Sequence, residues 1–149
     1  MEPGAHAVGR FLGSLKSLKV FNFMCYGLEP ALFEGLAEAG SYLINLKVEG
    51  RTLCTRASRA IASLSTLRYL SIASISCDVA PLASLKQLEA LVLLPSEEVD
   101  DDDVAIDGLS EGLAGMQKLD YLRLPPVPSG ACCFATHPDI HSLRYCIHF

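Results

Sequence analysis

A stripe of leucine residues changes its spacing along residues 82–93. The segment reads L-A-S-L-K-Q-L-E-A-L-V-L, so its leucines lie three residues apart and then two residues apart. Spacing of three is typical of a helix or helical turn, and spacing of two is typical of a strand with one buried face. The pattern therefore predicts a helical turn that leads directly into a short strand, with one apolar stripe facing the core throughout.

The same pattern recurs along the chain and predicts a repeat protein. Five copies fit L-x-x-L-x-L, a sixth copy is degraded, and successive copies begin 28, 24, 21, 31 and 24 residues apart. Each copy is expected to form one strand. The copies are Leu15, Leu18 and Val20; Leu43, Leu46 and Val48; Leu67, Leu70 and Ile72; Leu88, Leu91 and Leu93; Leu119, Leu122 and Leu124; and Leu143, Cys146 and His148.

The segments between these strands have helical features. Pro30 suits the first turn of a helix that ends at Gly40, and Thr55 suits the N-cap of the next helix. The apolar spacing over 104–116 is that of an amphipathic helix. Helices are therefore expected to alternate with the strands.

This arrangement resembles the leucine-rich repeat family, and most closely the ribonuclease-inhibitor-like type of repeat found in cytosolic innate-immune receptors of the NACHT class. The resemblance rests on the L-x-x-L-x-L copies and covers nearly the whole chain. It implies an α/β leucine-rich-repeat solenoid, with short parallel strands on the concave side and helices or helical turns on the convex side. We expect residues 1–149 to form a single domain of five to six irregular repeats, or a fragment of a longer array.

Composition and charge exclude several classes of function. The formal charge is −5, and residues 97–149 hold three Lys or Arg against ten Asp or Glu. Nucleic acid is therefore not expected as a partner, because a phosphate-binding surface needs clustered positive charge. No apolar run approaches the ~18 residues of a membrane span, so no membrane association is expected. No nucleotide-binding or hydrolase motif occurs, which predicts a protein that is not an enzyme.

The cysteines indicate a reducing compartment. Cys25 and Cys77 fall at the same place in the predicted repeat, where Leu53 also falls. A position shared by Cys and Leu is a small apolar core position, so we expect buried thiols and a cytoplasmic protein.

The outward positions of the predicted strands supply the candidate binding residues. In a solenoid of this type the outward side chains line the concave face, which is the usual contact surface. Tyr and Arg most often carry interface energy, and an apolar residue among them favours a protein partner. The candidates are Lys19, Lys47, Tyr69, Val92, Tyr121 and Arg123.

The C-terminal residues leave one metal hypothesis open. Thiolate and neutral imidazole are the ligands that Zn²⁺ prefers, but paired C-x-x-C spacing is missing and Pro138 interrupts any helix through both His137 and His141. No metal or other cofactor is therefore expected, and a terminal zinc site stays as an alternative. Its candidate ligands are Cys132, Cys133, His137, His141, Cys146 and His148. The acidic run 97–103 lacks the alternate spacing and the glycine of a calcium loop.

The sequence thus predicts a non-catalytic protein-protein interaction module whose concave face binds a protein partner. The family resemblance implies a part of an innate-immune receptor. A substrate-recognition repeat of a ubiquitin-ligase adaptor is the alternative on the same fold. Further repeats or another chain are expected at the open ends of the array, because a solenoid needs polar terminal repeats to cover its core.

Overall fold

The structure is built on one parallel β-sheet. The computed structural model describes residues 3–25, 30–50, 54–75, 80–95, 112–113, 115–124 and 142–145. Its six strands pair in sequence order, each parallel to the next. The strands are β1 (Val20–Cys25), β2 (Asn45–Gly50), β3 (Tyr69–Ile75), β4 (Ala90–Pro95), β5 (Tyr121–Leu124) and β6 (Ser142–Tyr145).

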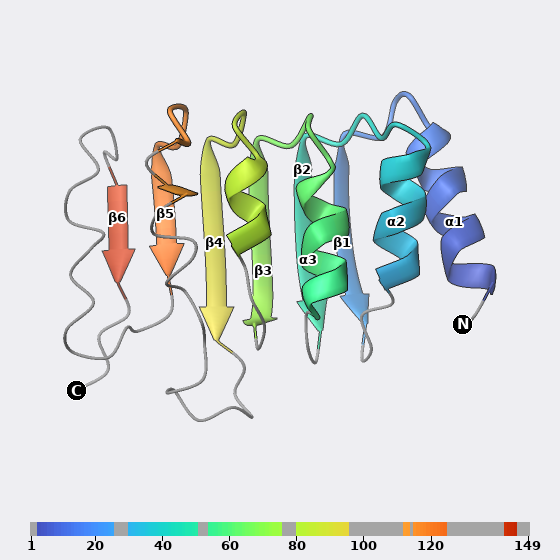
Figure 1. Ribbon diagram of the computed structural model, residues 1–149, viewed down its shortest axis with the longest axis horizontal. Helices are drawn as coiled ribbons and strands as arrows, with labels where there is room; N and C mark the ends of the chain where they lie inside the picture. Colours follow the sequence, from blue (N-terminus) through green and yellow to red (C-terminus); the bar gives the residue numbers. More distant parts are fainter. Residues whose placement is uncertain are drawn as a thin grey trace.

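Helices precede the first four strands and cover one face of the sheet. They are α1 (Pro3–Ser14), α2 (Pro30–Glu38), α3 (Thr55–Ala62) and the short 3₁₀ helix η1 (Ala80–Ser84). Figure 1 shows these helices side by side in one layer in front of the strands. The predicted α/β leucine-rich-repeat solenoid is therefore confirmed, with a strand layer and a helix layer stacked from repeat to repeat.

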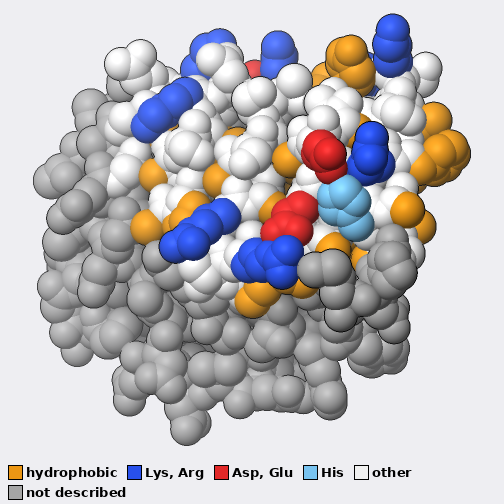
Figure 2. All heavy atoms as spheres, turned by 45° about the vertical axis from the view of Figure 1, so that its right-hand side comes forward, with side chains coloured by type: hydrophobic (Ala, Val, Ile, Leu, Met, Phe, Trp, Pro, Cys, Tyr) orange, Lys and Arg blue, Asp and Glu red, His pale blue; other side chains and the backbone are white. Residues whose placement is uncertain are grey.

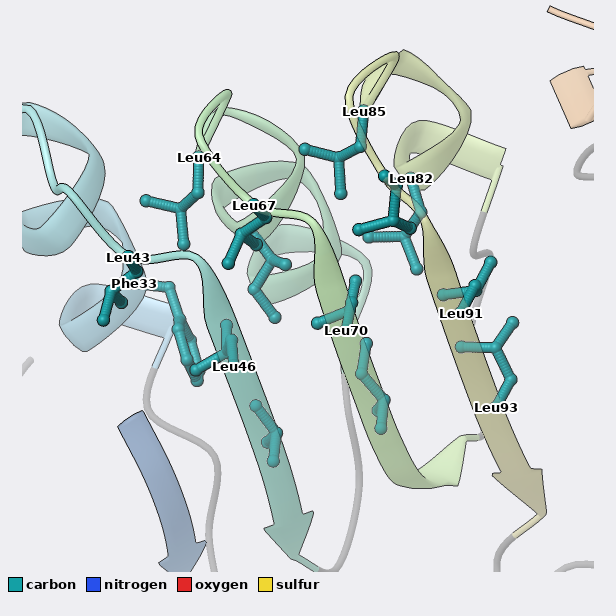
Figure 3. Close-up of a cluster of buried hydrophobic side chains, with 14 of the residues drawn as sticks. Phe33, Leu43, Leu46, Leu64, Leu67, Leu70, Leu82, Leu85, Leu91 and Leu93 are labelled. Carbon is teal, nitrogen blue, oxygen red and sulfur yellow. The ribbon is translucent and has the colours of Figure 1, made fainter. Parts of the chain in front are cut away.

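The leucine stripe fills the space between the two layers. Leu46, Leu70, Leu91 and Leu122 occupy one register row across β2–β5, and each is at least 98% buried. Figure 3 shows leucines from the strands and from the turns before them converging on the same interior. At the first strand, Phe23 completes this interior through an edge-to-face contact with Phe33, with ring centroids 6.1 Å apart.

A repeated pair of backbone turns carries the stripe into each strand. The Leu64 N–H donates to the Ile61 carbonyl at 2.9 Å, and the Leu67 N–H donates to the Leu64 carbonyl at 3.1 Å. The second repeat differs, because Gly40 adopts a positive φ of 70° and the Leu43 N–H donates to the Ser41 hydroxyl at 3.2 Å. The two bonds formed by the Leu64 and Leu67 N–H groups recur at Leu15 and Leu18, at Leu85 and Leu88, and at Met116 and Leu119.

A backbone hydrogen bond links each repeat to the next at the residue just before the strand, which we call the lead-in residue. The carbonyls of the lead-in residues Lys19, Ile44, Arg68 and Glu89 each accept two consecutive N–H groups of the following repeat at 2.7–3.1 Å. The lead-in residue Arg68, for example, accepts from Glu89 and Ala90. This shared acceptor fixes where each strand begins relative to its predecessor. The lead-in residues are Lys19, Ile44, Arg68, Glu89 and Asp120.

The predicted register of the first strand is wrong by three residues. Phe21 pairs with Leu46, and Phe23 pairs with Val48. The apolar positions assigned to Leu15, Leu18 and Val20 are therefore held by Leu18, Phe21 and Phe23. Leucines three residues apart continue back into α1, so two registers fit the leucine pattern equally well, and the aromatic residues that decide between them do not match it.

The sixth copy is displaced in the same way. Leu143 pairs with Leu122, so it holds the second apolar position, which the prediction gave to Cys146. Cys146 and His148 themselves lie outside the described residues.

The predicted equivalence of the cysteines fails for the same reason. Cys25 is the last residue of β1 and pairs with Gly50, so it does not share a position with Leu53. Leu53 and Cys77 lie outside the described residues. Cys54 is a free, exposed thiol.

The ends of α2 lie where the sequence predicted them, and the N-cap of α3 differs from the predicted one. Pro30 begins α2, and Gly40 follows its end with the positive φ that glycine accepts most readily. Thr55 is the first residue of α3, whose N-cap is Cys54. Of the predicted helix over 104–116, only 112–113 and 115–116 lie in the described part of the chain.

Glycines let the first two helices pack closely. A Cβ atom built at Gly9 would overlap the Leu32 carbonyl oxygen, and one built at Gly35 would overlap the His6 carbonyl oxygen. A Cβ at Gly13 would lie 2.8 Å from the Leu36 carbonyl oxygen. The backbones of α1 and α2 are therefore in direct contact.

Charged side chains bridge neighbouring helices on the outer surface. The Arg56 Nη2 donates to Glu34 Oε2 at 2.8 Å between α3 and α2, and His6 Nε2 lies 2.9 Å from Glu38 Oε2 between α1 and α2. Figure 2 shows basic and acidic side chains next to one another over this layer. Exposed pairs of this kind contribute little to stability, so the packing of the helices depends mainly on the core.

The alternation along β4 gives a stability prediction. Leu91→Ala removes a fully buried side chain and should lower the free energy of unfolding by about 2–5 kcal/mol. Val92→Ala, one residue along on the opposite face, should cost less than ~1.5 kcal/mol, because Val92 is only half-buried. Denaturant unfolding of both variants measures the difference, and equal losses would contradict the assigned faces.

The helix contact gives a second prediction. Gly35→Ala should destabilise the fold by about 1–3 kcal/mol, although alanine favours helices, because the added methyl group meets the backbone of α1. Gly4→Ala is the matched control, since nothing lies within 4 Å of its added Cβ. It should leave the thermal midpoint unchanged or raise it slightly. A stabilised Gly35→Ala variant would rule out the close contact.

Candidate functional site

The face of the sheet opposite the helices presents two adjacent rows of side chains, and we call these two rows the open face. Side chains alternate along a strand, so the residues between the buried leucines lie on this side. The first row is Val20, Asn45, Tyr69, Ala90 and Tyr121, and the second row is Asn22, Lys47, Ser71, Val92 and Arg123.

The structure brings five of the six predicted binding residues into these rows. Tyr69 and Tyr121 lie in the first row on either side of Ala90. Lys47, Val92 and Arg123 lie in the second row. Lys47 is exposed and pairs with Glu49 of the same strand at 2.5 Å. The predicted set thus forms a compact patch across β2–β5.

Lys19 lies apart from this patch. It precedes β1 as a lead-in residue, and its Nζ stands 5.2 Å from the ring centroid of Tyr42. This distance suits a cation–π contact. This error follows from the three-residue shift of the first strand, which gives the outward place predicted for Lys19 to Asn22.

A cleft of about 510 Å³ opens between the two tyrosines. Tyr69 and Tyr121 stand two strands apart, which places their backbones roughly 10 Å from each other. Ala90 between them has a side chain too small to fill this gap. The cleft is completed by Arg68, Glu89, Lys118 and Asp120, which lie just before the strands begin.

Glu89 orients the side chains on one wall of this cleft. The Tyr69 hydroxyl donates to Glu89 Oε2 at 3.0 Å, and Arg68 Nη1 lies 3.6 Å from Glu89 Oε1. The hydrogen bond to Glu89, together with its negative charge, raises the pKa of the Tyr69 phenol. In this contact the Tyr69 hydroxyl is the hydrogen-bond donor and the Glu89 carboxylate is the acceptor.

A second, smaller cleft of about 330 Å³ continues along the same edge toward β1. It is lined by lead-in residues Lys19, Ile44 and Arg68 and by side chains of the preceding turns, including Gln87. Gln87 Oε1 accepts a hydrogen bond from Lys118 Nζ at 2.5 Å. The polar edge is thus continuous from one cleft to the other.

Sequence reasoning missed the charged lead-in residues. Arg68, Glu89 and Asp120 occupy the same place in successive repeats, immediately before the outward residues Tyr69, Ala90 and Tyr121. Alignment of the repeats by register would have grouped them. The pattern of outward-facing strand residues could not identify the lead-in residues, because they precede the strands.

The described residues of the site do not include a cluster of metal-ligand side chains. Within the described ranges, no group of three or more His, Cys, Asp or Glu residues is placed to hold a metal ion. The candidate zinc ligands Cys132, Cys133, His137, His141, Cys146 and His148 lie outside those ranges, as does the acidic run 97–103. None of the described helices combines the length and the apolar character needed to cross a bilayer.

Comparison with solved structures shows the fold of the chain. It is similar to internalin C2 of Listeria monocytogenes, with a TM-score of 0.60 and 20% identity over 92% of this chain and 55% of that one. It is also similar to internalin F of the same organism, with a TM-score of 0.50 and 16% identity over 93% of this chain and 51% of that one. This chain therefore spans about half the length of each internalin structure, and it has the leucine-rich-repeat fold.

Sequence comparisons give no closer assignment. No protein-family model matches the chain, and no curated protein matches it. The ribonuclease-inhibitor-like subtype predicted from the repeats is not among the two similar structures described above.

The wall of the cleft gives a testable prediction. Glu89→Gln removes the charge that holds the Tyr69 proton, so the pKa of the Tyr69 phenol should fall toward its ordinary value of 10.0. NMR titration of tyrosine-labelled protein measures this change. A Tyr69 titration that does not move in the variant would show that the hydrogen bond is absent in solution.

Proposed function

We propose that this chain is a non-catalytic protein-protein interaction module that binds its partner through the open face, which is the concave side in solenoids of this type. The observation that carries the proposal is the patch itself. Two tyrosines flank an alanine in one row, and Lys47, Val92 and Arg123 line the next row. Such a combination of aromatic, basic and apolar groups is typical of interface centres.

The rigidity of the scaffold supports this proposal. Tyr69 and Tyr121 project from strands whose neighbouring leucines are locked in the core, and Glu89 holds the Tyr69 hydroxyl. A tyrosine has few rotamers to lose on binding, so a preset tyrosine contributes contact area at a small entropic cost. The open face therefore favours a partner that docks without reshaping the sheet.

The cleft specifies how that partner would engage. A volume of about 510 Å³ between Tyr69 and Tyr121 accommodates one or two large side chains of a partner. Arg68 is paired with Glu89, and Lys118 is held by Gln87, so charges of both signs surround the opening. Recognition by such a mixed edge should depend on the partner's pattern of polar groups more than on its net charge.

The repeat type supports a more specific role. The resemblance to ribonuclease-inhibitor-like repeats favours a sensing or regulatory part of a cytoplasmic innate-immune receptor. Full helices precede the first three strands, as that subclass requires. In this role residues 1–149 form one domain, or a fragment of a longer array.

Two alternatives use the same chain differently. A substrate-recognition repeat of a ubiquitin-ligase adaptor would also bind through the open face, and the identity of the captured partner distinguishes it from the receptor role. A terminal zinc module would instead retain stoichiometric metal on purification, which elemental analysis measures, and would lose it when Cys133 and His137 are replaced.

A double substitution tests the binding surface. Tyr121→Ala combined with Arg123→Ala removes one wall of the cleft and the adjacent basic side chain. We expect at least about tenfold weaker retention of the partner, because central Tyr and Arg residues dominate interface energy. Affinity capture from extracts of the source cells, with quantitative identification of bound proteins, measures the effect.

The control variant is Arg59→Ala, which removes an exposed charge from α3 on the helix side. It should retain the same partner as the native chain. Circular dichroism should show that all variants keep the fold. Equal capture by the double variant and the native chain would eliminate the open face as the binding surface.

A further inference from the structure

The turns that lead into the first three strands form a basic edge on an acidic chain. The formal net charge of the chain is −5, yet residues 15–19, 41–44 and 64–68 contain Lys16, Lys19 and Arg68 and no Asp or Glu. In Figure 1 these turns lie along the top edge of the molecule, where the strands begin. Positive charge is therefore concentrated on one part of this edge.

The smaller cleft, of about 330 Å³, lies on this basic edge. Among the described residues that line it there is no Asp or Glu, whereas the larger cleft is lined by Glu89 and Asp120. Apart from Ile44, every lining residue of the smaller cleft has an N–H or O–H donor in its side chain. These donor residues are Lys19, Tyr42, Ser65, Thr66, Arg68 and Gln87.

Backbone hydrogen bonds hold the two cations on either side of this cleft. The Lys19 carbonyl accepts from the Ile44 N–H at 2.8 Å, and the Ile44 carbonyl accepts from the Arg68 N–H at 2.8 Å. Lys19 and Arg68 therefore stand two repeats apart, with their backbones separated by roughly 10 Å. Their side chains are long enough to reach one small group between them.

Neither cation is hydrogen-bonded to a carboxylate within the described part of the chain. Lys19 Nζ lies 5.2 Å from the ring centroid of Tyr42, a contact that orients the ammonium group and leaves its N–H donors available. Arg68 Nη1 is 3.6 Å from Glu89 Oε1, which is beyond hydrogen-bond distance. The other oxygen of Glu89 accepts from the Tyr69 hydroxyl. Both cations therefore keep donors for a ligand.

Neutral groups complete the lining of the smaller cleft. The Thr66 hydroxyl donates to the Leu43 carbonyl at 2.7 Å, which ties the turn of the third repeat to that of the second. Gln87 Oε1 is occupied by Lys118, so the amide nitrogen of Gln87 remains to donate. Ser65 contributes an exposed hydroxyl. A ligand in this cleft thus meets hydrogen-bond donors on several sides.

The extent of the positive charge indicates which anion fits. Beyond Arg68 the lead-in residues are Glu89 and Asp120, so the basic edge ends at the cleft, and a nucleic-acid strand would need it to continue. Glu89 also offsets part of the Arg68 charge, which leaves Lys19 as the cation without a nearby carboxylate among the described residues. A carboxylate, with one negative charge, matches this balance better than a doubly charged phosphate group.

We propose that the smaller cleft binds the carboxylate of an Asp or Glu side chain of the protein partner. The inference rests on the proposed function, because it takes a protein partner as given, and it adds the chemistry that this part of the edge recognises. The carboxylate oxygens accept N–H groups from Lys19 and Arg68 in charge-assisted hydrogen bonds. The Ser65 hydroxyl and the Gln87 amide donate to the remaining lone pairs.

Titration of residues 1–149 with short peptides tests this site. Three peptides share the sequence acetyl-Gly-Gly-X-Gly-Gly-amide and carry Glu, Gln or phosphoserine at X. The Glu peptide should shift the NMR signals of the Ser65, Thr66 and Arg68 amides saturably, with a dissociation constant on the order of 1 mM. The uncharged Gln peptide should shift them much less at the same concentrations. Added salt should weaken the response to the Glu peptide.

A pair of variants separates the cleft from the general charge of the edge. Lys19→Gln should weaken binding of the Glu peptide roughly fivefold or more, because it removes a charged donor from the cleft. Lys86→Gln is the matched control, since Lys86 is also an exposed lysine of the turns but does not line the cleft. It should bind the Glu peptide like the native chain, and circular dichroism should show intact folds in both variants.

Three results would overturn the proposal. Equal responses to the Glu and Gln peptides would show that no carboxylate is bound. A response to the phosphoserine peptide alone would assign the cleft to a phosphate group. Equal weakening by Lys19→Gln and Lys86→Gln would indicate diffuse attraction along the edge and no defined site.

The peptide experiment is independent of the test of the open face. Neither Tyr121 nor Arg123 lines the smaller cleft, so the variant that replaces both should bind the Glu peptide like the native chain. Unchanged capture of the partner by that variant would remove the open face as the binding surface and would leave the peptide response as it is. Loss of the peptide response would remove only the carboxylate site.

Discussion

Burial of one leucine stripe between sheet and helices is the constraint on which the rest of the structure depends. The stripe fixes which strand residues face inward, and parallel pairing repeats that choice in every strand. A slip by one residue in β3, for example, would move Leu70 and Ile72 to the open face and Tyr69 into the core. The position of the two rows of the open face is thus a consequence of the core.

The lead-in carbonyls give this constraint its accuracy. At Lys19, Ile44, Arg68 and Glu89 the carbonyl accepts two N–H groups of the next repeat, so each of the strands β2–β5 begins at a place set by the preceding repeat. The same residues carry the charged side chains of the cleft, such as Arg68 and Glu89. The same repeated position therefore sets the start of each strand and supplies the charged side chains of the cleft. The cleft is thus a consequence of the regular repeat.

The inner repeats could be predicted from the sequence because their leucines are unambiguous. Strands β2–β5 have the predicted inward residues, and Tyr69, Val92, Tyr121 and Arg123 lie on the open face as expected. Buried and exposed side chains alternate along each of these strands, and only one register places the leucines in the core. The predicted fold and most of the predicted patch depended on this distinction.

The ends of the array could not be predicted in the same way. In the first repeat, apolar residues three apart run from α1 into the turn, and Phe21 and Phe23 replace the strand leucines. The close contact between α1 and α2 was not foreseen either, because Gly9 and Gly35 matter only when two helices are already side by side. The cleft was missed because its charges come from residues before the strands.

The repeated turn-and-strand block has a further consequence for how such a chain can change over generations. The block from Leu64 to Ile72 has the same length as those from Leu85 to Leu93 and from Met116 to Leu124, whereas the spacing between blocks varies by several residues. Insertions and deletions are thus absorbed in the connecting segments. Lineages can lengthen those connections and diversify the outward residues independently, while the geometry that presents them is inherited unchanged.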